Sequence, residues 1–432
     1  MSSRGAHGTR DPRIDLLRGV AILLVILYHI NNLIIFPGGY GLARGADGTA
    51  HLPTGSMFWR GLFLPFHLGR IGVNLFFVIS GLCIHMRFAR QQAASLDPPF
   101  SLRTFFLRRF FRIYPVYWIA LGVGVFIAPF AYRAAFPAGA PEAHGLPALA
   151  DITAHVFMLH SFFKLYMMGI INSLWSIATE EQFYLLYPVV FVLIGRRLAI
   201  PRIVIGLLIL SLAWRLAFVL CNPPPHTFYD GPFLVWVFGF SIPRYFEWSL
   251  GALLAWAIAN GKTLAFILPG RAGSWIGARP RVVVVVGLGF ILVGVASMLR
   301  AQTKYLFEDP CYSTGWFLVV AATLLPSSRR VAGVAWVHLA ALCRWVAARL
   351  ESLGRRSFSV YLLHEVVLFV VSGLKQRFHI PAVVAAPAAC GLIWVVCYPF
   401  YRYVEAPFEQ RSKMVGRRQP PPALLINADP QT

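Results

Sequence analysis

Two ionisable residues, Arg18 and His29, lie inside the first long apolar stretch of the sequence. Such side chains are costly inside a bilayer and usually serve a function there. They are 11 positions apart, close to three helical turns, so they share one helix face and lie about 16 Å apart along its axis. A histidine on such a face can act as a general base or carry a group covalently. The structural alternatives are a snorkelling anchor for Arg18 and a hydrogen-bonded core histidine for His29.

Two adjacent carboxylates, Glu180 and Glu181, lie about two turns into a later apolar stretch that begins near Asn172. We expect them at a depth similar to that of His29, where a carboxylate is costly unless it is paired or protonated. A pair of His29 with Glu180 would orient the imidazole as a general base. The alternative is that either carboxylate only ties neighbouring helices together.

Three arginines, Arg108, Arg109 and Arg112, lie within one helical turn of each other, just before Tyr114. The guanidinium fork suits phosphate groups, so this cluster predicts a phosphate-binding site, with a plain membrane-surface anchor as the alternative. In a late apolar stretch, His364 is expected near mid-membrane, where it either takes part in chemistry or is structural.

The elements that position these residues must be transmembrane helices. The chain has 432 residues, of which 58% are hydrophobic and 13% charged, with a mean hydropathy of +0.65; soluble domains carry about 25% charged residues. A helix needs about 20 mostly apolar residues to span a bilayer, and we predict an all-α polytopic bundle of about ten such helices. They are expected near residues 15–36, 68–86, 113–131, 174–195, 200–221, 244–260, 282–299, 312–326, 357–374 and 383–401.

The net charge of +22 follows from the membrane topology rather than from nucleic-acid binding. With the N-terminus in the cytoplasm, the inner segments hold 27 of the 39 Lys and Arg residues and the outer segments hold 8. This asymmetry fits the positive-inside rule. The even number of helices then places both termini in the cytoplasm.

One transmembrane domain is expected over residues 1–410, followed by a disordered cytoplasmic tail over 411–432. Within it, 151–172 is expected to form a re-entrant or interfacial helix. The first apolar run is not typical of a cleavable signal peptide. The six cysteines show no metal-ligand spacing, and no metal site is predicted.

Taken in order, these segments resemble the membrane acyltransferase family 3, the bacterial integral-membrane O-acyltransferases. The likeness spans roughly residues 13–410. It rests on Arg18 with His29, Gly72 to Gly81, Arg108 to Pro115, Trp175-Ser176 through Glu180-Glu181 to Tyr184, Ser357 to His364, and Glu405 to Phe408. Two positions depart from the family pattern: Asn74 stands where many members carry an acid, and Phe358 where many have Tyr. Some members add an outer hydrolase-like domain, which here is expected to be separate or unnecessary.

The resemblance implies an acyl-CoA donor, most often acetyl-CoA, and an acceptor hydroxyl outside the bacterial plasma (inner) membrane. It implies catalytic roles for His29, Glu180 and Glu181, and donor binding by Arg18, Arg108, Arg109, Arg112 and Tyr114. Supporting roles fall to Asn74, Ser80, Trp175, Ser176, Tyr361 and His364. Direct transfer and a transient acyl-histidine both remain open, as do the acceptor, the acyl chain length and the oligomeric state.

A rival hypothesis is a proton-coupled exporter of a small solute, in which the buried His and Glu residues would relay protons. Such a transporter does not need a phosphate-binding arginine cluster, so CoA binding separates the two.

Overall fold

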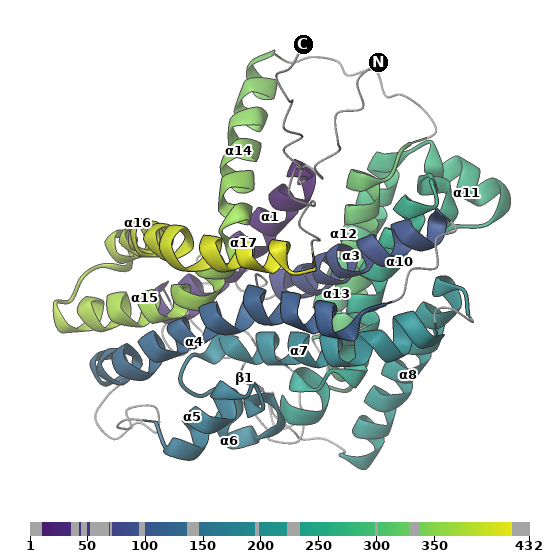
Figure 1. Ribbon diagram of the computed structural model, residues 1–432. Coiled ribbons are helices and arrows are strands. Elements are labelled where there is room, and N and C mark those ends of the chain that lie inside the picture. The colour runs from purple at the N-terminus through teal and green to yellow at the C-terminus, as the bar shows by residue number, and fades with distance from the viewer. Residues whose placement is uncertain are drawn as a thin grey trace, which may run out of the picture.

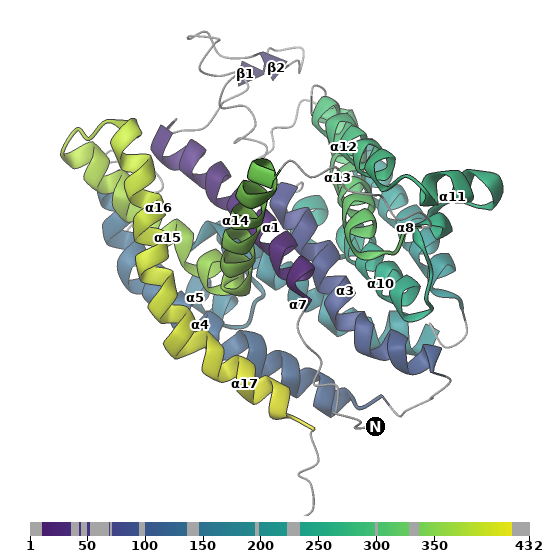
Figure 2. The same cartoon turned by 90° about the horizontal axis from the view of Figure 1, so that it is seen from above.

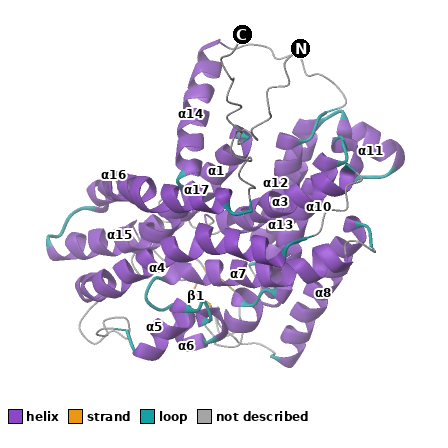
Figure 3. Ribbon diagram, in the orientation of Figure 1, coloured by secondary structure: helices purple, strands orange, loops and turns teal. Residues whose placement is uncertain are grey.

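The fold is a bundle of helices (Figures 1 and 3). The computed structural model describes residues 11–35, 43–44, 50–51, 69, 71–94, 100–135, 147–194, 198–222, 234–298, 301–327 and 337–416. The long helices are α1 (Pro12–Ile30), α3 (Ile71–Ala93), α4 (Leu102–Ala135), α7 (Trp175–Tyr187), α8 (Ile200–Cys221), α10 (Tyr245–Ala259), α12 (Pro280–Ser297), α13 (Ala301–Leu324), α14 (Val337–Arg355), α15 (Ser357–Arg377) and α16 (Ala382–Phe400).

Shorter elements connect or extend these helices. They are β1 (Ala43–Arg44), β2 (Ala50–His51), α5 (Leu149–Val156), α6 (Lys164–Met167), α11 (Gly270–Gly277) and α17 (Ala406–Met414), with π-helical turns at Asn31–Ile35, Pro188–Ile194, Leu234–Gly239 and Tyr401–Glu405, and 3₁₀ turns at His160–Phe162, Asn172–Leu174, Ile242–Arg244 and Leu264–Ile267. The antiparallel pair β1–β2 is the only strand pairing in the described residues.

The predicted all-α membrane bundle is confirmed. Eight helices within the described residues are long and apolar enough to cross a bilayer. Two further predicted segments, 244–260 and 312–326, are also helical and form α10 and part of α13. Of these, α10 has only 15 residues, and α13 buries Lys304, Glu308 and Asp309. The cytoplasmic placement of the termini stays a prediction.

Two details differ from expectation, one near the end of the sequence and one in the segment 151–172. Helix α17 continues to Met414, so the expected tail boundary at residue 411 falls inside a helix that packs on α4; residues 417–432 lie outside the described part of the chain. The expected helix over 151–172 is divided into α5, a 3₁₀ turn at His160–Phe162, and α6.

Helix α14 was not predicted, because its many polar residues keep its mean hydropathy below that of a transmembrane helix. It stands across the direction of α4 and α15 and crosses α1 (Figures 1 and 2). Glycines allow the two backbones to touch: a Cβ atom on Gly19 would lie 2.0 Å from the Leu350 carbonyl oxygen, and one on Gly354 would lie 1.7 Å from that of Asp15. Small residues serve this purpose at helix contacts in membranes.

Helices α3 and α10 make a second close contact. A Cβ atom on Gly81 would lie 1.9 Å from the Trp248 carbonyl oxygen, and one on Gly251 would lie 1.9 Å from that of Val78. This contact brings α10 beside the face of α3 that carries Asn74 and Ser80.

Candidate active site

His29 lies near the end of α1 and contacts α15 through two side chains. Its Nδ1 atom is 3.0 Å from the Val25 carbonyl oxygen and 3.2 Å from His364 Nε2. Its Nε2 atom is 3.6 Å from Glu365 Oε1. Only 15% of the His29 side chain is exposed; protein groups hold Nδ1, and Nε2 faces the Glu365 carboxylate.

The carboxylate beside His29 is therefore Glu365, and the expected pair of His29 with Glu180 is wrong. Glu365 is 1% exposed, and its Oε2 atom accepts a hydrogen bond of 2.7 Å from the backbone N–H of Ser173. Glu180 follows Ser173 by seven positions, which places it about 10 Å from Ser173 along the axis of α7. Ser173, at the start of this segment, is thus at the level of His29, and Glu180 is not.

His364 defines the tautomer of His29. Its Nδ1 atom lies 3.1 Å from the Val360 carbonyl oxygen and 2.8 Å from that of Tyr361. Because carbonyl oxygens only accept, His364 Nδ1 carries the hydrogen, and its Nε2 atom is left to accept from His29 Nδ1. The free lone pair of a neutral His29 is then on Nε2, the atom that faces Glu365.

Ser176 and Tyr361 lie next to this group. The Tyr361 hydroxyl is 2.5 Å from Ser176 Oγ and donates to the Ser173 carbonyl oxygen at 3.0 Å. Tyr361 is also close enough to Glu365 and Glu180 to interact with both carboxylates. The structure brings these two predicted residues together with His29 and His364.

Glu180 belongs to a separate cluster deeper in the bundle. It accepts short hydrogen bonds from the Ser80 and Tyr184 hydroxyls. The indole N–H of Trp248 donates to Ser80 Oγ at 3.2 Å. The spacing of Ser173, Ser176, Glu180 and Tyr184 places them on one stripe of α7 and its preceding turn, which joins this cluster to the His29 group.

Glu181 and the arginine cluster lie beside Glu180. Glu181 interacts with the Tyr114 hydroxyl, and its Oε2 atom has no hydrogen-bond partner within the described residues. The guanidinium of Arg109 lies over the Tyr184 ring at 5.7 Å. Arg109 Nε is buried and likewise without a hydrogen-bond partner in the part of the chain described.

The other two arginines of the cluster bind the C-terminal helix. Arg108 donates to the Val415 carbonyl oxygen through two nitrogens, at 3.0 and 2.8 Å. Arg112 forms ion pairs with Glu405 at 3.1 Å and Glu409 at 3.3 Å, and its guanidinium lies over the Phe358 ring. These contacts give both residues a role in fastening α17 to α4.

Arg18 faces α3 rather than His29. Its guanidinium is 3.5 Å from Asp15 Oδ1 and 3.3 Å from Cys83 Sγ. With 23% of its side chain exposed, Arg18 is partly open at the charged end of α1.

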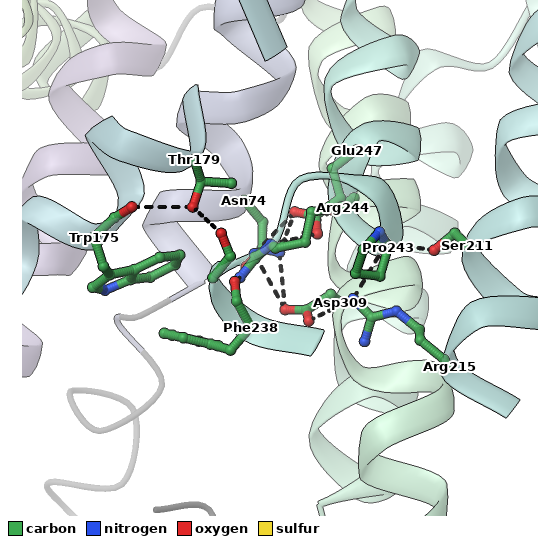
Figure 4. A network of polar contacts seen from close by, with 12 residues as sticks. Asn74, Trp175, Thr179, Ser211, Arg215, Phe238, Pro243, Arg244, Glu247 and Asp309 are labelled. Atoms are coloured by element: carbon green, nitrogen blue, oxygen red, sulfur yellow. Dashed lines mark hydrogen bonds and ion pairs between the residues drawn. The ribbon is translucent and has the colours of Figure 1, made fainter. Parts of the chain in front are cut away.

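Asn74 and Trp175 lie in a third cluster, shown in Figure 4. Asn74 Nδ2 donates to Glu247 Oε2 at 2.8 Å, and Arg244 binds Glu247 at 2.9 Å and Asp309 at 3.4 Å. The guanidinium of Arg244 also lies 5.3 Å from the centre of the Trp175 ring.

Arg215 completes this buried network with a 2.9 Å ion pair to Asp309. Two arginines face two carboxylates, and the amide at Asn74 adds donors without adding charge. This explains the departure at Asn74: an acid there would place a third carboxylate against Glu247.

A pair of histidines lies between α5 and the turn that follows it. The rings of His155 and His160 stack at 3.9 Å with 6° between their planes, and both are fully buried. His155 Nδ1 is 2.9 Å from Asp151 Oδ1. Burial, with His155 next to it, lowers the pKa of His160 to about 3.

Sequence reasoning missed Glu365, Glu247 and Asp309. The available signal was the same one that identified Glu180, an acid inside a membrane helix. Among the described residues, no group of three or more His, Cys, Asp or Glu side chains could hold a metal ion.

Comparison with known proteins points to one family. The family model described as "Acyltransferase domain" matches residues 11–402. The chain is 23% identical over 413 residues to the peptidoglycan O-acetyltransferase OatA of Listeria monocytogenes, covering 93% of this chain and 56% of the relative. It is 24% identical over 420 residues to a putative O-acetyltransferase of Staphylococcus aureus, covering 93% and 58%.

A putative peptidoglycan O-acetyltransferase of Bacillus subtilis, YrhL, is 25% identical over 393 residues, covering 87% of this chain and 51% of the relative. The chain thus spans just over half the length of these relatives. No solved structure matches it.

Proposed function

Because the chain belongs to the acyltransferase domain family, we propose that it moves an acetyl group from cytoplasmic acetyl-CoA to a hydroxyl on the outer side of the bacterial plasma membrane. The observation that carries this proposal is the group formed by His29, His364 and Glu365 at 3.2 and 3.6 Å. The positive-inside count supports the direction of transfer.

His29 acts as the general base. Its Nε2 atom takes the proton of the acceptor hydroxyl while the hydroxyl oxygen attacks the thioester carbon. The carbon–sulfur bond then breaks, and the proton passes to the CoA sulfur, which gives an ester and free CoA. Glu365 stabilises the positive charge on the imidazole during transfer, and His364 keeps Nδ1 as the donor.

In this proposal, acetyl-CoA binds along the stripe of α7 that carries Ser176, Glu180 and Tyr184. Arg109, with its buried Nε atom free of a hydrogen-bond partner within the described residues, binds a CoA phosphate. The carboxylate of Glu180 accepts from the amide N–H groups of the pantetheine arm. From Tyr184 to Ser173 the stripe measures about 16 Å, a length that an extended arm can follow toward His29. Arg108 and Arg112 support this site by fixing α17.

A covalent route uses the same residues. His29 Nε2 attacks the thioester and holds the acetyl group until the acceptor arrives. Rapid quenching with labelled acetyl-CoA and no acceptor separates the two routes. Label on a peptide that contains His29 supports the covalent route; single-turnover release of CoA only when acceptor is present contradicts it.

The acceptor is proposed as a sugar hydroxyl of the cell wall. This rests on relatives named as peptidoglycan O-acetyltransferases. The test is the transfer of labelled acetyl groups to peptidoglycan fragments, compared with other glycans and small alcohols.

The first experiment measures the binding of acetyl-CoA to purified protein in detergent. Wild type is compared with Arg109→Ala and His29→Ala. We expect Arg109→Ala to weaken binding and His29→Ala to bind normally without turnover. If the folded wild type binds neither acetyl-CoA nor longer acyl-CoAs, the proposed donor is wrong and proton-coupled export becomes the better explanation.

A further inference from the structure

A groove on the outside of the bundle lies where α14 meets α1 and α16. The cavity has a volume of about 370 Å³, and side chains from α1, α14 and α16 line it, among them Leu23, Trp345, Arg349, Leu353 and Trp394. It is on the α14 side of α1, away from the α3 side where Arg18 binds Cys83. The proposed acetyl transfer uses none of its residues.

Arg349 lines this groove, and Arg356 lies against Trp394, another lining residue; neither arginine has an acidic partner in the described structure. The guanidinium of Arg349 is 5.2 Å from the centre of the Trp345 ring. That of Arg356 is 4.6 Å from the Trp394 ring and 4.8 Å from the Tyr398 ring. Arg356 Nη1 is buried and makes no hydrogen bond to any described residue. A buried guanidinium nitrogen without a partner points to an anion that belongs there.

The surroundings are those of a membrane surface. In the middle of α14, 58% of Trp345 and 41% of Val346 are exposed, next to Arg344 and Arg349 on the same helix. Trp and Arg are the residues that anchor helices at the boundary of a bilayer. Leu23, 11 residues after Pro12, lies about 16 Å into α1, which is the depth of acyl chains.

We propose that this groove binds a phospholipid with an anionic headgroup. The headgroup phosphate pairs with Arg349 and Arg356, and an acyl chain lies along Leu23 and Leu353. Basic pockets between membrane helices on the cytoplasmic side favour anionic headgroups. The apolar wall favours a phospholipid over a soluble phosphate compound, because only the phospholipid has an acyl chain that can contact the leucines.

The test measures the thermal midpoint of the purified full chain in detergent at rising concentrations of phosphatidylglycerol or phosphatidylcholine. We expect phosphatidylglycerol to raise the midpoint and phosphatidylcholine to leave it nearly unchanged. In the double variant Arg349→Gln/Arg356→Gln, the apparent affinity for phosphatidylglycerol should fall by about tenfold or more. Equal effects of the two lipids on wild type would overturn the proposal.

Arg279→Gln is the matched control, since Arg279 lies over the Trp275 ring at 4.5 Å but not at this groove. Equal losses of affinity in the control and the double variant would mean that general surface charge is responsible, which would contradict the proposal.

If the double variant is unstable without lipid, the binding of phosphatidylglycerol is measured with Leu23→Trp instead. This variant fills part of the groove and keeps both arginines, so it should weaken phosphatidylglycerol binding. Normal binding by Leu23→Trp, or displacement of the lipid by free CoA, contradicts the assignment.

Discussion

The Nε2 atom of His364 lies 3.2 Å from the Nδ1 atom of His29, and backbone carbonyls on the other side of His364 leave that Nε2 atom as an acceptor. We expect His364→Leu to lower kcat by on the order of 10²-fold, because His29 loses the partner that fixes its tautomer. His364→Gln should retain part of the activity, since its amide oxygen can accept. Acetyl transfer at saturating donor measures both, and equal rates in His364→Leu and wild type would contradict this role.

Substitutions of the two carboxylates, Glu365 and Glu180, are expected to change different kinetic constants. Glu365→Gln should lower kcat by about 10²-fold or more with little change in the KM for acetyl-CoA, because it removes the charge that stabilises protonated His29. Glu180→Gln should mainly raise that KM. Steady-state kinetics with varied donor separate them, and the opposite pattern would return Glu180 to the role first expected of it.

Arg112 should matter for stability more than for donor binding. Arg112→Gln leaves Glu405, which is fully buried, without its cation, so the free energy of unfolding should fall by about 2 kcal/mol or more. Lys413→Gln is the control, because its pair with Glu409 is at a side chain that is 60% exposed and should contribute about 0–1 kcal/mol. Thermal midpoints in detergent measure both; equal midpoints for the two variants would show that the Arg112 contacts stabilise little.

Asn74→Asp should destabilise the bundle by about 1–3 kcal/mol, since it sets a third carboxylate beside Glu247 and Asp309. The double variant Asn74→Asp/Glu247→Gln restores the number of charges and should recover most of the thermal midpoint. If the single variant is as stable as wild type, the charge balance of this network is not what selects an amide at residue 74.

The stability should depend on pH through His160. Its pKa is lowered to about 3 in the folded chain, against 6.5 for an ordinary histidine. Between these values the unfolded chain binds a proton that the folded chain does not, so stability is lost as the pH falls below about 6.5, by up to about 1.4 kcal/mol per pH unit. His160→Gln should flatten the change in thermal midpoint between about pH 7.5 and pH 5. Identical pH profiles would contradict this.

The sequence was enough to predict most of the long helices, because hydropathy indicates the spans, and to single out His29 and His364 as buried ionisable residues. That the two side chains meet at 3.2 Å was not predicted. It was not enough to choose between Glu180 and Glu365. Both lie in membrane helices, and counting residues from the membrane surface gives each a depth but no direction. The choice depends on how α15 is rotated against α1, which only tertiary packing determines.

The arginine cluster shows the same limit. Arg108, Arg109 and Arg112 look alike in sequence, yet α17 binds two of them and leaves the third facing Tyr184. Helix α14 escaped prediction for another reason: its sequence mixes polar and apolar residues and contains no long apolar run.

The glycine contacts between α1 and α14 join α14 directly to the helix that carries His29. With backbone against backbone at Gly19 and Gly354, the two helices have no side-chain layer between them that could absorb a displacement. The two helices should therefore shift together, so that a displacement of α14 is transmitted to the helix that carries His29.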